Sequence, residues 1–107
     1  MKVLLDECVD PKVRSFFSSK FQVTHIKDLG WLGVKNGELI ARADGICDAL
    51  FTIDGNMAFQ TSLKGRTLRV AVGQGHFRSL EAYRTAVEEF ERIAESIPPG
   101  SYHFLFR

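Results

Sequence analysis

Cysteine is scarce in this chain, and several other features are missing altogether. The two cysteines, Cys8 and Cys47, have no C-x-x-C spacing, which argues against a redox or zinc motif and predicts two reduced, mostly buried thiols. Residues 1–30 carry charges throughout and lack the apolar core of a secretory signal. No apolar run approaches the roughly 20 residues that span a bilayer. The expected location is the cytoplasm of a bacterium or archaeon, without a membrane partner.

An excess of charge of one sign is also missing. The formal net charge of +1 excludes the strong field of a purely electrostatic nucleic-acid binder. It does not exclude a nuclease, which needs an acidic centre and only a local basic rim. The chain has 107 residues, 45% hydrophobic and 25% charged, as in an ordinary globular domain. We therefore expect one domain spanning residues 1–107.

Hydrophobic periodicity predicts that strands and helices alternate along the chain. Strands are predicted at residues 2–5, 21–26, 48–53, 66–72 and 101–106, and helices at residues 11–18, 37–46 and 80–97. Asp10, Asn36 and Ser79 precede the three helices as candidate N-caps. The nearly continuous apolar run at 48–53 is typical of a strand covered on both faces of a parallel sheet. The order predicts the α/β class, with a mainly parallel central sheet.

Carboxylates follow two of the predicted strands. Asp6 comes directly after residues 2–5, and Asp54 directly after residues 48–53. Ligands of open α/β sheets bind outside the carboxyl ends of the strands, so both side chains converge on one crevice if the strands are neighbours. Glu38, in the first turn of the second helix, would lie at the same end of the sheet. Clustered carboxylates repel one another unless a cation neutralises them, and oxygen ligands favour Mg²⁺ or Mn²⁺.

Each of these acids also has a purely structural explanation. Aspartate at the end of a strand often forms a turn or caps a helix. Glutamate in a first helical turn is favoured by the helix dipole. Spacing alone leaves both explanations open.

Three segments resemble the PIN-like domain family, which is related to the toxin ribonucleases of bacterial toxin–antitoxin pairs. They read VLLDEC, DLGWLGVKNGELIARA and ALFTIDGNMAFQTSLKGRTLRVAV, and cover roughly residues 2–72. The resemblance implies a three-layer α/β/α sandwich and a site for Mg²⁺ or Mn²⁺. Carried over by position, it makes Asp6, Glu38 and Asp54 the catalytic and metal-binding residues. Glu7 and Asn56 are further candidate metal ligands.

Asn56 departs from the family pattern. Nuclease members usually carry a further acid shortly after the position of Asp54, where this chain reads Asp54-Gly55-Asn56-Met57. An amide oxygen can ligate a metal or hold a metal-bound water, but it adds no charge. Activity could therefore be weak, or lost while the fold is retained.

Basic residues supply candidate contacts to RNA. Lys64, Arg66 and Arg69 form the densest basic stretch and would hold an RNA backbone near the metal site, although a solvated strand edge explains them equally well. The loop VGQGHFRSL lacks the third glycine of a dinucleotide motif, because Arg78 stands there. It is interpreted as a tight turn, from which His76 and Arg78 could still reach phosphates near the crevice.

Four other polar residues are interpreted as structural. His25 lies in an alternating strand and is expected to be packed. Asp28 is expected to cap the loop to which it belongs, and an extra acid near the site is the alternative. Asp44 and Asp48 are expected to form turns at the end of the sheet opposite Asp54.

These expectations give two main hypotheses. The first is a metal-dependent endoribonuclease, a toxin with an antitoxin partner, which the resemblance implies would leave a 5′-phosphate and a 3′-hydroxyl. The second is a non-catalytic PIN-like module that binds protein or nucleic acid. A phosphatase or other phosphotransferase is a third hypothesis. The apolar segment 101–106 is in addition a candidate edge strand for pairing into a homodimer.

Overall fold

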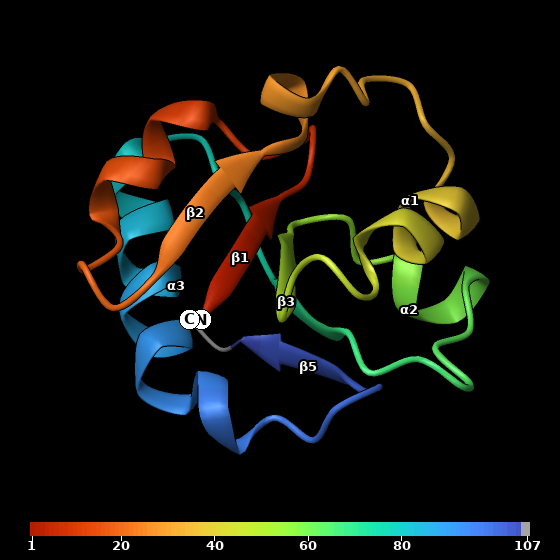
Figure 1. The fold of residues 1–107 in the computed structure, drawn as a ribbon. Coiled ribbons are helices and arrows are strands. Elements are labelled where there is room, and N and C mark those ends of the chain that lie inside the picture. The colour runs from red at the N-terminus through yellow and green to blue at the C-terminus, as the bar shows by residue number, and fades with distance from the viewer. Residues whose placement is uncertain (106–107) are drawn as a thin grey trace.

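Five short strands form one parallel sheet in the computed structural model, which describes residues 1–105 (Figure 1). The strands are β1 (Lys2–Leu5), β2 (Gln22–His25), β3 (Ala49–Thr52), β4 (Arg69–Gly73) and β5 (Tyr102–Leu105). Their order across the sheet is β2-β1-β3-β4-β5, and every neighbouring pair is parallel. The predicted α/β class and parallel sheet are therefore confirmed. Phe106, predicted to end the last strand, lies outside the described residues.

Helices connect the strands. They are the α-helices α1 (Asn36–Ala43), α2 (Met57–Gln60) and α3 (Leu80–Ile93), and the 3₁₀ helices η1 (Pro11–Phe16), η2 (Ile26–Leu29) and η3 (Ala94–Ser96). Gly30 ends η2 in the left-handed conformation, with φ of 72°, which a residue without Cβ adopts at little cost. None of the helices within residues 1–105 has both the length and the apolarity to cross a membrane.

Two of the three predicted N-caps are confirmed. The Asp10 carboxylate accepts a hydrogen bond from the Lys12 N–H (2.9 Å), and the Ser79 hydroxyl accepts one from the Ala82 N–H (3.4 Å). The prediction for Asn36 is wrong: Lys35 is the N-cap of α1, and Asn36 is the first helical residue. Its side-chain nitrogen instead donates to Asp54 Oδ2, in the segment between β3 and α2.

Each face of the sheet has its own apolar core, because side chains alternate along a strand. Leu5 and Phe51 point to the face covered by α3 and η1, where the Phe51 ring meets Phe90 edge to face at 5.8 Å. Leu4 and Leu50 point to the opposite face, with α1 and α2 (Figure 1). Complete burial of one such side chain contributes about 1.5–3 kcal/mol to folding. The paired cores hold the sheet between two helical layers.

The position of β1 determines where a ligand can bind. β1 pairs with β2 on one side and β3 on the other, so the chain reverses its direction of travel across the sheet at this strand. In open parallel sheets ligands bind outside the carboxyl ends of the strands at such a reversal. Asp6 follows β1 and Asp54 follows β3, as predicted. The two strands are neighbours, which is the condition for the two side chains to share one crevice.

Two aspartates close the amino edge of the sheet, as their predicted turn roles require. Asp48 accepts a hydrogen bond from the Lys2 N–H at 2.7 Å. Asp44 Oδ1 accepts bonds from the N–H groups of Thr67 and Leu68, each at 3.0 Å, and from the Thr67 hydroxyl at 3.2 Å. The Thr67 N–H is the main cause of the lowered pKa of the Asp44 carboxyl. Asp44 thereby joins the end of α1 to the segment that enters β4.

Replacement of Asp44 tests this link. Asp44→Ala should lower the urea midpoint at pH 7, because two backbone N–H groups lose their acceptor. Asp44→Asn keeps the accepting oxygen but not the charge, so its loss should be smaller. A lowered pKa means that the charge contributes fully above the usual value of 3.8 and that the contribution disappears as the pH falls below it. The difference between wild type and Asp44→Asn should therefore shrink below about pH 4; a constant difference would contradict the assignment.

Candidate functional site

Asp6 is a buried carboxylate at the end of β1. Its side chain is 6% exposed, and its backbone N–H continues the β1–β3 ladder by donating to the Phe51 carbonyl oxygen at 3.0 Å. Oδ1 accepts a hydrogen bond from the Glu7 N–H at 2.8 Å, and Oδ2 accepts one from the Thr52 hydroxyl at 2.7 Å. A buried charge needs such partners, because desolvation without them costs several kcal/mol. These bonds fix the orientation of the carboxylate.

Thr52 links the two candidate aspartates. It is the last residue of β3, and its side chain is fully buried. Its hydroxyl donates to Asp6 Oδ2 and accepts from the Asp54 N–H at 3.0 Å. One hydroxyl therefore joins the ends of two neighbouring strands. Thr52 was not among the predicted site residues. Its hydroxyl needs hydrogen-bond partners, however, because every residue of β3 is buried.

Asp54 is half-buried and already has two protein partners. Oδ1 accepts a hydrogen bond from the Asn56 N–H at 3.0 Å, which forms the turn into α2. Oδ2 lies 3.4 Å from the Asn36 side-chain nitrogen, at the start of α1. Asp54 therefore has the turn-forming role expected of an aspartate at the end of a strand, and this strand is the neighbour of the one that Asp6 follows. Asn36 was predicted only as a helix N-cap, and its contact with Asp54 was not predicted.

The other three predicted ligands are exposed residues. Glu7 is exposed, and its Oε1 accepts a bond from the Gly33 N–H at 2.9 Å. Glu38 is exposed and pairs with Arg42, one turn along α1, at 2.7 Å. Asn56 is exposed and contacts the site through its backbone. Within residues 1–105, no three side chains among His, Cys, Asp and Glu are placed together to hold a metal ion.

The candidate aspartates carry the type of ligand atom that a hard divalent cation prefers. Mg²⁺ is commonly bound by one or two carboxylates, with waters and substrate phosphates as the other ligands. Asp6 and Asp54 supply two carboxylates, and each accepts only part of the hydrogen bonds that its oxygens can take. Asn56 offers an amide oxygen on the same turn. An all-oxygen set of this kind suits Mg²⁺ or Mn²⁺.

Cys8 borders the site with a protonated thiol. Its Sγ lies 3.6 Å from Asp6 Oδ2 and 3.5 Å from the Thr52 hydroxyl oxygen. Burial around the sulfur raises the pKa of the Cys8 thiol, and the negative charge of Asp6 adds to the effect. Both cysteines are free; Cys47 is half-buried, and Cys8 is exposed as a residue although its sulfur atom packs against Asp6 and Thr52, so the prediction of two mostly buried residues holds only in part. A thiol with a raised pKa is a poor nucleophile at neutral pH.

The predicted RNA-binding stretch lies at the other edge of the sheet. Arg69 begins β4 beside Ala49, the first residue of β3, so Lys64 and Arg66 precede the amino edge. The Arg69 guanidinium donates to the Ile97 carbonyl oxygen at 2.7 Å, and Arg66 lies 3.8 Å from Asp44. The structure therefore does not bring these residues to the edge where the candidate aspartates lie. Their contact with RNA stays a prediction.

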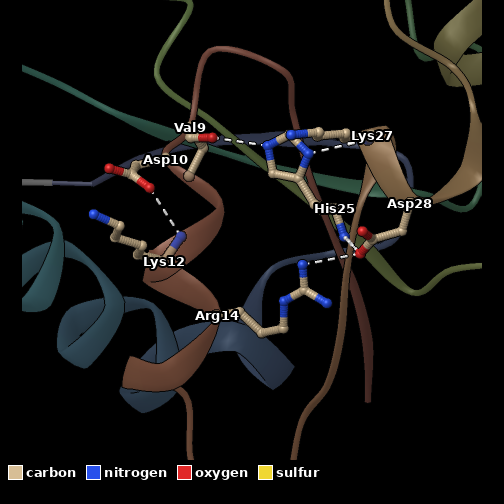
Figure 2. A network of polar contacts seen from close by, with 7 residues as sticks. All are labelled: Val9, Asp10, Lys12, Arg14, His25, Lys27 and Asp28. Carbon is tan, nitrogen blue, oxygen red and sulfur yellow. Dashed lines mark hydrogen bonds and ion pairs between the residues drawn. The ribbon is translucent and has the colours of Figure 1, made fainter.

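A buried histidine holds the loop that carries Asp6 (Figure 2). His25 is 2% exposed, as predicted for a packed residue. Its Nε2 donates to the Val9 carbonyl oxygen at 2.8 Å, and its Nδ1 accepts from the Lys27 N–H at 3.0 Å. Asp28 accepts from the His25 N–H at 3.3 Å and pairs with Arg14 at 2.9 Å, which confirms its capping role. The end of β2 thus restrains the segment after β1.

Removal of the Thr52 hydroxyl should destabilise the protein. Thr52→Val conserves the volume but leaves Asp6 and the Asp54 N–H each without one partner, so we expect a loss of about 1–3 kcal/mol in the free energy of unfolding. Thr52→Ser keeps the hydroxyl and should lose less, about 1 kcal/mol for the missing methyl group. Urea denaturation of the two variants measures this. A valine variant as stable as the serine variant would contradict the bridging role.

Removal of the His25 ring should loosen the Asp6 loop. His25→Ala leaves the buried Val9 carbonyl without its donor, and we expect a loss of about 2 kcal/mol in stability. Amide hydrogen exchange of Val9, whose N–H bonds the Asp6 carbonyl oxygen at 3.0 Å, should become faster. His76→Ala, at an exposed position, is the matched control. Unchanged exchange at Val9 would show that His25 does not restrain the loop.

Comparison with known proteins does not add an assignment. No protein-family model matches the chain, and no curated protein or solved structure is significantly similar to it.

Proposed function

We propose that the protein is a metal-dependent endoribonuclease with a PIN-like fold, acting at Asp6 and Asp54. The observation that carries the proposal is the pair of aspartates at the ends of adjacent parallel strands, linked through the hydroxyl of Thr52. They lie at the reversal of strand order, where open parallel sheets bind ligands. The resemblance of residues 2–72 to the PIN-like family supports the same residues.

The residues around the pair hold it ready for a cation. The Thr52 hydroxyl and the Glu7 N–H orient the Asp6 carboxylate, and the Asn56 N–H orients that of Asp54. Such fixed donors reduce the reorganisation needed when a ligand binds. When bound, Mg²⁺ or Mn²⁺ supplies an acidified water and stabilises charge on a phosphodiester.

Glu38 remains the third candidate ligand under this proposal. Its ion pair with Arg42 is exposed, with 60% of the glutamate side chain accessible. An exposed pair at spacing i,i+4 contributes only about 0.3–0.5 kcal/mol, so exchange of Arg42 for a metal costs little. Substrate or metal binding could therefore recruit Glu38 without disturbing the core.

The second candidate function is a binding module without catalysis. The observation that favours it is that Asp6 and Asp54 already accept hydrogen bonds from protein groups, while Asn56 stands where the family has a further acid. Asp6→Asn would then leave function unchanged. We propose RNA as the partner and the cytoplasm as the location under either function, and an antitoxin partner under the nuclease proposal alone.

Cleavage of a mixed-sequence single-stranded RNA tests the nuclease proposal. Wild type should cut with Mn²⁺ or Mg²⁺ and not with EDTA, since the aspartates need the cation to act. The double variant Asp6→Asn, Asp54→Asn should lose activity by a factor on the order of 100 or more. Glu88→Gln, on the exposed face of α3, is a control for the loss of a carboxylate and should cut normally.

The outcomes separate the two functions. Equal cutting by wild type and the double variant would place the activity elsewhere and contradict the proposal. No cutting by wild type with either metal would also reject it, and binding of the RNA without cutting would favour the binding module.

A further inference from the structure

A hollow adjoins the candidate site between the loop after β1 and the loop between β4 and α3. Its volume is about 240 Å³, and its lining includes Cys8, Asp10, Phe77, Arg78, Ser79 and Tyr83. Cys8 forms the wall shared with the site, because its sulfur contacts both Asp6 and Thr52. A group in the hollow would therefore sit one side chain away from the aspartate pair. The volume is several times the roughly 30 Å³ that a water molecule occupies, so a phosphodiester group fits.

Arg78 is the cation of this hollow. It is exposed and forms no ion pair within residues 1–105. The hollow also contains a carboxylate, Asp10, which is the N-cap of η1 and whose Oδ1 accepts from the Lys12 N–H at 2.9 Å. Its negative charge repels an anion. An anion in the hollow would lie on the Arg78 side, away from Asp10. The exposed Ser79 hydroxyl is a neutral donor beside it.

The segment that carries Arg78 is anchored to the core. The ring of Phe77 packs on Tyr83 at 4.8 Å between centroids. It also passes so close to Gly73 that a Cβ there would lie 2.8 Å from the tip of the ring. The Tyr83 hydroxyl is 3.5 Å from the Cys8 carbonyl oxygen, across the hollow. The neighbour of Phe77 in the chain, Arg78, therefore projects from a fixed base rather than from a loose loop.

We propose that this hollow binds a phosphodiester of single-stranded RNA, with Arg78 as the contacting cation. The inference rests on the proposed ribonuclease function and adds the path of the strand, from the aspartate pair past Cys8 to Arg78. A guanidinium suits this role because its planar donors match two phosphate oxygens at once. Lys64, Arg66 and Arg69 lie at the opposite edge of the sheet and are not needed for this path.

RNA binding in EDTA tests the subsite without cleavage. We would measure fluorescence anisotropy of a labelled single strand of about eight nucleotides at about 50 mM salt. Arg78→Ala should raise the Kd about tenfold and reduce the salt dependence by about one phosphate contact. Arg92→Ala, which removes the same charge from an exposed position on α3, should change the Kd less than about twofold.

The outcomes separate the subsite from the chemistry. Equal Kd values for the Arg78 and Arg92 variants would overturn the subsite, as would wild type that does not bind the strand. Binding that depends on Arg78, in a protein that cuts no RNA with Mn²⁺ or Mg²⁺, would reject the nuclease and keep the subsite. Cutting by wild type with binding indifferent to Arg78 would keep the nuclease and reject the subsite.

Discussion

The hydroxyl of Thr52 joins the two strands on which the candidate site is built. It donates a hydrogen bond to the buried carboxylate of Asp6 and accepts one from the backbone N–H of Asp54. A carboxylate as buried as that of Asp6 is tolerated only with such donors, because its lost hydration must be replaced. The same atoms therefore stabilise the end of the β1–β3 ladder and orient the site. A change at Thr52 therefore alters the strand ends and the geometry of the candidate site together.

Aspartates lie at both edges of the sheet, and their partners distinguish them. At the amino edge, Asp44 and Asp48 accept hydrogen bonds from backbone groups far along the chain and close the structure. At the carboxyl edge, the backbone partners of Asp6 and Asp54 come from the turns that follow them. The basic side chains also differ between the two edges. Arg66 lies near Asp44 and Arg69 donates to the Ile97 carbonyl oxygen at the amino edge, while Arg78 borders the hollow beside the site.

Local patterns predicted the features that depend on local physics. Periodicity and capping composition gave the α/β class and the caps Asp10 and Ser79, because each rests on a few consecutive residues. The sequence also predicted that Asp6 and Asp54 each follow a strand. That the two strands are neighbours, the condition for their side chains to share one crevice, comes from the structure. The predicted cap at Asn36 failed, because α1 begins at Asn36 itself and Lys35 occupies the N-cap position.

Contacts between distant segments account for the rest. The hydrogen bond between Thr52 and Asp6 joins residues 46 positions apart in the chain, and no local pattern in either segment predicts it. The i,i+4 spacing of Glu38 and Arg42 favours their ion pair, but it does not indicate how exposed that pair is. The basic stretch 64–69 was expected near the metal, although residues that precede a parallel strand lie at its amino edge. Topology, rather than composition, decides which charges meet.

Titration with Mn²⁺, followed by electron paramagnetic resonance, tests the central claim that the Asp6–Asp54 pair is a hard-cation site. Wild type should remove the free-ion signal in a saturable way, and the double variant with both aspartates changed to asparagine should not. A wild-type protein without saturable binding, or a double variant that binds equally well, would contradict the account.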